Sequence, residues 1–273
     1  RDVAPSRGLG DVYKRQLVKS PLKKSEGRFE IDFEDFAQKA ADPKVRLLML
    51  CNPHNPSGRI WTRQELEKIA DIAAKNDLWI VSDEIHCDLI RTGLSHIPMG
   101  KIMPEYKKLI TTISASKTFN LAGMLFSNII IRDEEERNRF QDRDKNIGAA
   151  NPLSVAAHKA AYEHGGRWLS ELKEYIDESF RMVDSFLKEN IPQARFTVPE
   201  ATYFAWVDMS RVLPDVEDLP LFFANNSGVL LEGGDGLFVD NAKGYIRLNL
   251  AMPRATIEEG LRRMAEAIEK HNR

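Results

Sequence analysis

Cysteine is scarce in this chain of 273 residues, which contains two, and no apolar run approaches the ~18 residues that a membrane-spanning helix needs. Two cysteines cannot build a disulfide framework, so we expect a protein of the reducing cytoplasm without a membrane partner. An excess of one charge is also lacking, because the formal net charge is −2. The sequence has no basic stripe, and we therefore expect no nucleic-acid partner.

The first sixteen residues differ from the rest of the chain. They begin without methionine and contain neither an apolar stretch typical of a signal peptide nor any periodicity. We predict that residues 1–16 are a non-native lead-in to the fold.

Strand and helix patterns alternate through the first half of the chain. Short apolar runs predict strands at residues 47–51, 78–82, 109–114 and 126–131. Between the first two, Thr62 and Glu65 have the spacing of a capping box and predict a helix that runs to about residue 76. Such alternation predicts an α/β fold with a mostly parallel sheet that is covered by helices on both faces.

The second half has a different pattern. From 167 to 190, apolar residues recur at intervals of three and four residues, which predicts one long amphipathic helix. Strands are then expected at 195–198, 202–208, 229–231 and 244–250, and a second capping box at Thr256 predicts the last helix. We therefore predict a large domain at 17–166, a linking helix at 167–190 and a smaller α+β domain at 191–273.

Three polar motifs follow three of the predicted strands. They read Asn-Pro-His-Asn-Pro-Ser-Gly at 52–58, Ser-Asp-Glu-Ile-His at 82–86 and Ser-Ala-Ser-Lys-Thr at 114–118. In an open α/β sheet, ligands bind beyond the carboxyl ends of the strands, so the three motifs are expected to converge. A lysine, an aspartate and an amide there suit pyridoxal 5′-phosphate (PLP), which needs a Schiff-base lysine and an acidic partner for its ring nitrogen.

In this order the three motifs resemble the fold-type I PLP-dependent enzymes of the class I/II aminotransferase superfamily. Within this superfamily, the motif sequences most resemble those of the MalY/PatB-type cystathionine β-lyases, or cysteine-S-conjugate β-lyases. The resemblance runs from about residue 29 to the end of the chain. It implies a PLP-dependent transferase-like fold, an amino-acid substrate and a homodimer. Because family members carry further residues before this point, we expect the chain to be incomplete at its N-terminus and inactive as given.

The resemblance assigns roles to several residues. Lys117 would bind the cofactor covalently and remove the Cα proton of the substrate, and Asp83 would keep the ring nitrogen protonated. Asn55 would donate to the phenolic oxygen, and His86 stands where many aminotransferases have a tyrosine that contacts the same oxygen. The structural alternatives are a surface lysine, a strand-end aspartate cap, a turn asparagine and a core histidine.

Further residues concern the phosphate and the substrate. Ser114 and Ser116 are candidates for phosphate contacts, since hydroxyls near a strand–helix turn bind anions. Leu125 stands where many aminotransferases have an arginine. Arg247 resembles the arginine that binds the substrate α-carboxylate, for which a guanidinium fork is well suited.

A zinc site could be drawn from Cys51, His54, His86 and Cys87, but neighbouring residues rarely both point at one metal, and we expect none. The resemblance predicts β-elimination from cysteine S-conjugates such as cystathionine, giving a thiol, pyruvate and ammonia. An aminotransferase is the nearest alternative, and His86 and Leu125 speak against it. A regulatory or binding protein on the same scaffold is the alternative of another class.

Overall fold

The structure is a computed structural model that describes residues 16–25, 27–144, 150–234 and 242–273. The predicted lead-in of residues 1–16 therefore lies, apart from Gln16, outside the described residues. Among the described residues, no helix combines the length and apolarity that a membrane crossing requires.

Contacts divide the chain into two compact units. The motif unit, which holds the three polar motifs, comprises Phe33–Tyr175 and Glu200–Thr202. The C-terminal unit comprises Ile176–Pro199, Tyr203–Arg273 and the described residues up to Asp32. The domain limits predicted from the sequence remain a prediction.

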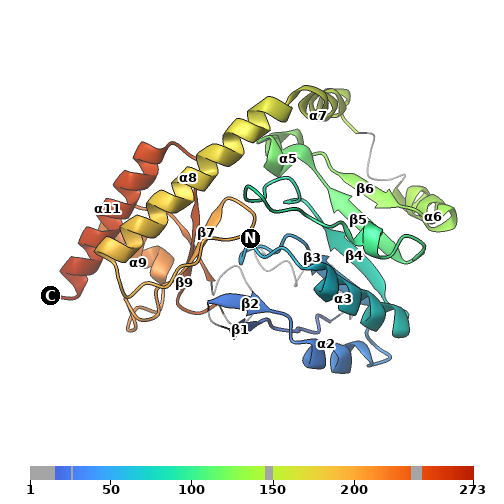
Figure 1. Ribbon diagram of the computed structural model, residues 1–273, viewed down its shortest axis with the longest axis horizontal. Helices are drawn as coiled ribbons and strands as arrows, with labels where there is room; N and C mark the ends of the chain where they lie inside the picture. The colour runs from blue at the N-terminus through green and yellow to red at the C-terminus, as the bar shows by residue number, and fades with distance from the viewer. Residues whose placement is uncertain (1–15, 26, 145–149, 235–241) are drawn as a thin grey trace. The chain divides into compact units, whose positions relative to one another are not determined.

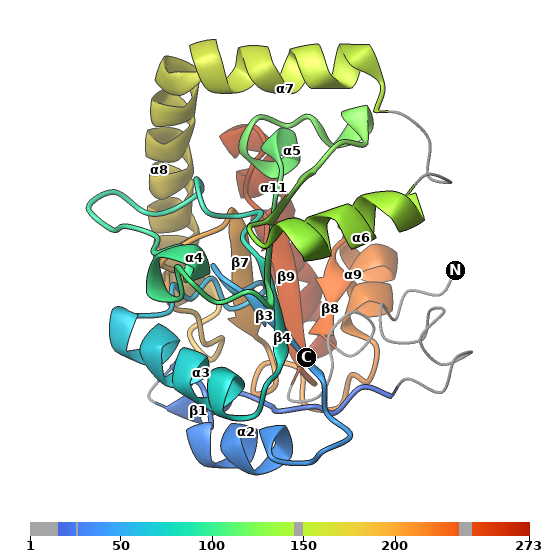
Figure 2. The same ribbon diagram turned by 90° about the vertical axis from the view of Figure 1, so that its right-hand side faces the viewer.

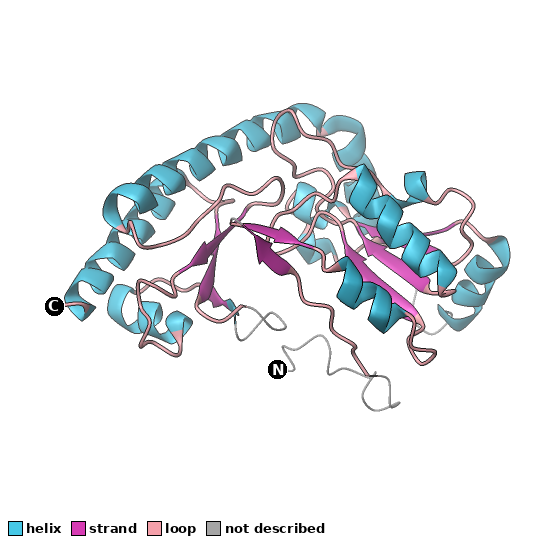
Figure 3. Ribbon diagram, turned by 60° about the horizontal axis from the view of Figure 1, so that its bottom comes forward, coloured by secondary structure: helices cyan, strands magenta, loops and turns pink. Residues whose placement is uncertain are grey.

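A four-stranded sheet forms the centre of the motif unit (Figures 1 and 3). β3, β4 and β5 are parallel neighbours, and β6 pairs antiparallel with β5. The predicted α/β fold with a mostly parallel sheet is confirmed. Each strand coincides with a short apolar run of the sequence. Their bounds are β3 Leu47–Cys51, β4 Trp79–Asp83, β5 Leu109–Ile113 and β6 Asn128–Ile131.

Helices follow the strands of this unit. α3 begins with the predicted capping box: Thr62 Oγ1 accepts from the Glu65 backbone N–H at 3.2 Å, and Glu65 Oε2 accepts from the Thr62 N–H at 2.7 Å. Helix bounds are α2 Phe33–Ala40, α3 Arg63–Lys75, α4 Met99–Ile102, α5 Ala115–Thr118, the 3₁₀ helix η2 Ala122–Met124, α6 Glu134–Asp144, α7 Pro152–His164 and α8 Gly166–Asn190.

The two faces of the sheet differ in burial. On one face Leu50, Ile80 and Leu109 are buried. On the other, Leu47 and Met49 of β3 are 48% and 72% exposed. The predicted helical cover of both faces therefore stays a prediction, because these two residues of the edge strand β3 contact solvent.

The C-terminal unit contains an antiparallel sheet in the order β7-β9-β8 (Figure 2). The part of α8 that belongs to this unit buries the predicted apolar stripe, including Ile176, Phe180 and Val183. The bounds are β1 Lys23–Ser25, β2 Arg28–Glu30, β7 Phe204–Asp208, α9 Leu219–Ser227, β8 Glu232–Gly233, β9 Tyr245–Asn249 and α11 Arg254–His271.

Three local predictions in this unit are wrong. Residues 195–198 form a single bridge, between Arg195 and Asp208, instead of a strand. The strand expected at 229–231 lies at Glu232–Gly233, and Leu230 is 89% exposed. The capping box predicted at Thr256 does not form. The last helix begins two residues earlier, at Arg254, with Pro253 as its N-cap and without a side-chain cap bond. Proline suits this place because its fixed φ is compatible with the start of a helix.

Candidate functional site

The three motifs leave the sheet at neighbouring strand ends. Cys51 pairs with Asp83, and Asp83 pairs with Thr112, so the ends of β3, β4 and β5 are level. The Asn52 N–H donates to Asp83 O at 2.9 Å, and the Glu84 N–H donates to Thr112 O at 2.9 Å. The polar residues that follow therefore emerge together along one edge of the sheet, as the sequence predicted.

Lys117 and Asp83 lie within electrostatic reach of each other. Lys117 is the third residue of α5 and is half-buried. Asp83 is exposed, and its Oδ1 accepts from the Ile85 N–H at 3.1 Å. Desolvation by the surrounding chain raises the pKa of Asp83, the bond from Ile85 lowers it, the Glu84 charge raises it, and the Lys117 ammonium lowers it. The structure thus brings the predicted lysine and aspartate together.

Asn55 and His86 occupy the two adjoining loops. Asn55 is partly buried between Pro53 and Pro56. Burial raises the pKa of Cys51 to about 11, and a hydrogen bond from the Asn55 backbone opposes this rise. His86 is 2% exposed, and its carbonyl accepts from Leu89 N–H at 3.0 Å. A buried histidine at this place fits both the cofactor role and the core alternative.

Ser114 acts as the cap of α5. Its Oγ donates to Phe126 O at 2.7 Å and accepts from the Ser116 N–H at 3.0 Å, and the residue is buried. Ser116 is partly exposed, whereas Leu125 has a positive φ of 50° and is 92% exposed. The capping bonds occupy the Ser114 hydroxyl, so the phosphate role predicted for the two serines rests more on Ser116.

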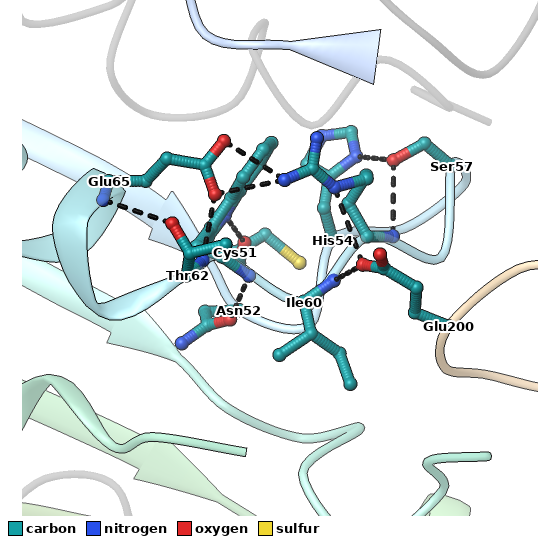
Figure 4. A network of polar contacts seen from close by, with 10 residues as sticks. Cys51, Asn52, His54, Ser57, Ile60, Thr62, Glu65 and Glu200 are labelled. Atoms are coloured by element: carbon teal, nitrogen blue, oxygen red, sulfur yellow. Dashed lines mark hydrogen bonds and ion pairs between the residues drawn. The ribbon is translucent and has the colours of Figure 1, made fainter. Parts of the chain in front are cut away.

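A polar network fixes the Asn55 loop against α3 (Figure 4). Arg59 is buried, and its Nη2 donates to both carboxylate oxygens of Glu65 at 2.9 Å. Glu200 pairs with Arg59 at 3.4 Å and accepts from the Ile60 N–H at 2.8 Å. Trp61 Nε1 donates to Cys51 O at 2.9 Å, which ties the loop to the end of β3. Sequence reasoning missed this network, because Glu200 is remote in the chain.

His54 lies inside the same loop. Its Nδ1 is 2.8 Å from Ser57 Oγ, and its ring is tilted against Trp61 with 5.7 Å between the centroids. Burial lowers the pKa of His54 to about 4, and the Arg59 charge contributes. Among the described residues, no group of three or more His, Cys, Asp or Glu side chains could hold a metal ion, so the zinc alternative gains no support.

Two carboxylates that support the site were passed over in the sequence. Glu84 is 2% exposed; it accepts from Ser82 Oγ at 2.9 Å and the Met99 N–H at 3.0 Å, and it pairs with His96 at 2.9 Å. Asp88 accepts from the hydroxyl of Thr118, the neighbour of Lys117, at 2.9 Å. Glu84 and Asp88 stand within or just after the second motif, and strand alternation was the signal that could have found Glu84.

Arg247 belongs to the C-terminal unit. It lies in β9, opposite Trp206 of β7 and Glu232 of β8. Its Nε donates to Glu232 Oε2 at 2.6 Å, and the guanidinium carbon lies 4.1 Å from the centroid of the Phe204 ring. Glu232 of the neighbouring strand is therefore a charge partner of Arg247.

Comparison with known proteins gives consistent matches. The family model described as aminotransferase class I and II matches residues 12–264. Cystathionine beta-lyase PatB of Bacillus subtilis is 37% identical, over 93% of this chain and 66% of the relative. The PLP-bound C-S lyase from Staphylococcus hominis has a TM-score of 0.91 and 44% identity, over 95% of this chain and 66% of that one. Cystalysin from Treponema denticola, which contains PLP, has a TM-score of 0.91 and 35% identity, over 95% of this chain and 66% of that one. The chain spans just under two thirds of the length of these proteins.

Proposed function

Because the chain belongs to the aminotransferase class I and II family, we propose that it is a PLP-dependent carbon–sulfur β-lyase. Its substrates would be cysteine S-conjugates such as cystathionine, and its products a thiol, pyruvate and ammonia. The observation that carries the proposal is that β3, β4 and β5 end level, so that the motifs holding Asn55, Asp83 and Lys117 leave the same edge of the sheet. The names of PatB and of the Staphylococcus hominis lyase support the choice of reaction.

The residues of the motif unit fit PLP. The cofactor needs an amine for its covalent attachment and an acid for its ring nitrogen. Lys117 supplies the amine from a short capped helix. Asp83 is exposed, and its second carboxylate oxygen, Oδ2, accepts no hydrogen bond from the described residues, so it can take a proton-bearing nitrogen. Asn55, His86 and Ser116 would complete the contacts around the ring and phosphate.

PLP, when bound, supplies an electron sink that makes the Cα proton of an amino acid acidic. Lys117 Nζ would accept that proton and later return one. The carboxylate of Asp83 would hold the proton on the ring nitrogen, since an adjacent negative charge favours the protonated form. Arg247 would orient the substrate through its α-carboxylate, a role that is proposed from the family resemblance.

The chemistry of the neighbouring side chains favours elimination over transamination. His86 replaces the tyrosine of many aminotransferases, and Leu125 is an exposed apolar residue where those enzymes have a cation. The two reactions are separated by their products. An aminotransferase returns a keto acid and an aminated cofactor, whereas the lyase releases pyruvate and ammonia.

Assembly and location belong to the same proposal. We propose a homodimeric enzyme of the cytoplasm that acts on a small amino acid and binds neither nucleic acid nor membrane. The near-neutral charge and the two free cysteines, Cys51 and Cys87, support this view. Sedimentation equilibrium of the PLP-loaded protein at micromolar concentration measures the oligomeric state.

The decisive experiment combines product analysis with mapping of the cofactor. The PLP-loaded full-length protein is incubated with cystathionine, and pyruvate and ammonia are assayed. In parallel, borohydride reduction followed by peptide mapping should place the cofactor on Lys117. Lys117→Ala should lose both signals, and Lys101→Ala, an exposed lysine of α4, should lose neither. Label on another peptide would contradict the assignment of Lys117, and a keto acid without ammonia would replace the lyase by an aminotransferase.

A further inference from the structure

An ion pair lies at the edge of the sheet in the C-terminal unit. Arg247 in the central strand β9 faces Glu232 in the edge strand β8, directly opposite in the antiparallel register. Both Nε and Nη2 of Arg247 donate to Glu232 Oε2, and the Nε–Oε2 distance is 2.6 Å. Opposite charges in this cross-strand position attract each other, so the pair is built into the strand pairing.

The two partners are held unequally. The Arg247 side chain is 11% exposed, and its guanidinium lies over the Phe204 ring. The Glu232 side chain is 48% exposed and stands on a strand of two residues. A carboxylate that is half in water loses little solvation when it moves away, whereas a buried guanidinium without a partner is costly. Glu232 is therefore the partner that can be displaced.

Tyr203 lies within electrostatic reach of both charges. Burial raises the pKa of Tyr203, Arg247 lowers it, and Glu232 raises it. Any carboxylate that binds Arg247 enters a region where a negative charge is already present.

We propose that Glu232 is a place-holder for the substrate carboxylate at Arg247. The inference rests on the proposed function, in which Arg247 binds that carboxylate. A carboxylate binds a guanidinium best through two parallel bonds along one edge, and Glu232 occupies the Nε–Nη2 edge. Glu232 compensates the buried charge of Arg247 while the substrate is absent, and it lowers the affinity for α-carboxylates by competition and by like-charge repulsion.

The test uses two small probes that react with the carbonyl group of PLP. Aminooxyacetate carries a carboxylate, and O-methylhydroxylamine does not. Their apparent dissociation constants for the PLP-loaded protein are measured from the change in cofactor absorbance. Glu232→Gln should tighten aminooxyacetate about three- to tenfold, between the effects of an exposed and a buried charge pair, and leave O-methylhydroxylamine unchanged. Glu217→Gln, which removes an exposed carboxylate of the same unit, is the matched control and should change neither.

Arg247→Gln separates failure of this inference from failure of the proposed function. If Arg247→Gln weakens aminooxyacetate alone while Glu232→Gln does not tighten it, the place-holder is refuted and the role of Arg247 stands. If Arg247→Gln leaves the ratio of the dissociation constants of the two probes unchanged, Arg247 does not bind the carboxylate. Both the place-holder and the proposed role of Arg247 are then refuted.

Urea unfolding gives a second readout. Without a probe, Glu232→Gln should unfold at lower urea than the natural sequence, and aminooxyacetate should raise its midpoint more. An unchanged midpoint counts against the compensating role.

Discussion

The partly buried histidine of the first motif should make the protein sensitive to mild acid. His54 lies between Ser57 and Arg59, and its pKa is about 4, against about 6.5 for an ordinary histidine. Ser57 Oγ is 2.8 Å from Nδ1 and also accepts from the Arg59 N–H at 3.4 Å, an arrangement in which the hydroxyl can donate its own proton to the ring. That arrangement suits the neutral imidazole, and the Arg59 charge opposes its protonation.

The direction of the effect follows from the proton balance. Between pH 6.5 and 4 the unfolded chain binds a proton at His54 that the folded protein does not, so stability falls as the pH falls through this window. At pH 5 the shift corresponds to a loss of about 2 kcal/mol relative to pH 7.5, and its limit below pH 4 is about 3 kcal/mol. A loss of this size is a large fraction of the stability of an ordinary domain.

The assay compares the natural sequence with His54→Gln, which keeps a polar side chain of similar reach and cannot titrate. Urea unfolding is followed at pH 5 and pH 7.5 by tryptophan fluorescence, since Trp61 is buried beside His54. The natural sequence should lose about 2 kcal/mol more than the variant, because all other groups titrate in both proteins. A His54 proton resonance that titrates near pH 6.5, or parallel stability losses in the two proteins, would refute the reasoning.

Two further predictions concern the support of the site and its thiols. Thr118→Val should lower the free energy of unfolding by about 1–2 kcal/mol, because the buried hydroxyl donates to the Asp88 carboxylate at 2.9 Å. The double variant with Asp88→Asn should lose less than the sum of the single losses in urea titrations, and additive losses would show that the two residues are not coupled. Burial raises the pKa of Cys51 to about 11 and that of Cys87 to about 12. Iodoacetamide at pH 7.5 should therefore alkylate both at least about a hundredfold more slowly than in urea, as followed by mass spectrometry, and rates within tenfold would contradict the shifts.

The strands of the motif unit were predictable because each is a short apolar run that ends in polar residues. The strand predicted at 47–51 agrees with β3, β4 lies one residue later than predicted, and β5 ends one residue earlier. A short, nearly continuous apolar run is the sequence signature of strands in a parallel sheet. The convergence of the motifs then followed from the rule that parallel strands end at the same edge.

The C-terminal unit was less predictable because its edge strand has no apolar signature. Val229-Leu230-Leu231 looks like a strand, yet Leu230 is 89% exposed, and pairing begins at Glu232. The register of β8 places Glu232 opposite Arg247, and a cross-strand ion pair has no local sequence signal. The partner of Arg247 could therefore be found in the structure alone.

The carboxylates Asp83 and Glu84 are adjacent in the sequence, but the structure shows that their burial differs. Asp83 ends β4 exposed, whereas Glu84 points into the interior, because successive side chains alternate. Three groups hold Glu84: the Ser82 hydroxyl, the Met99 N–H and the His96 ring. The buried carboxylate thus anchors the turn, and its neighbour keeps an oxygen toward solvent. The motif identifies which residues are present, and the opposite burial of these two neighbours decides which of them can meet a ligand.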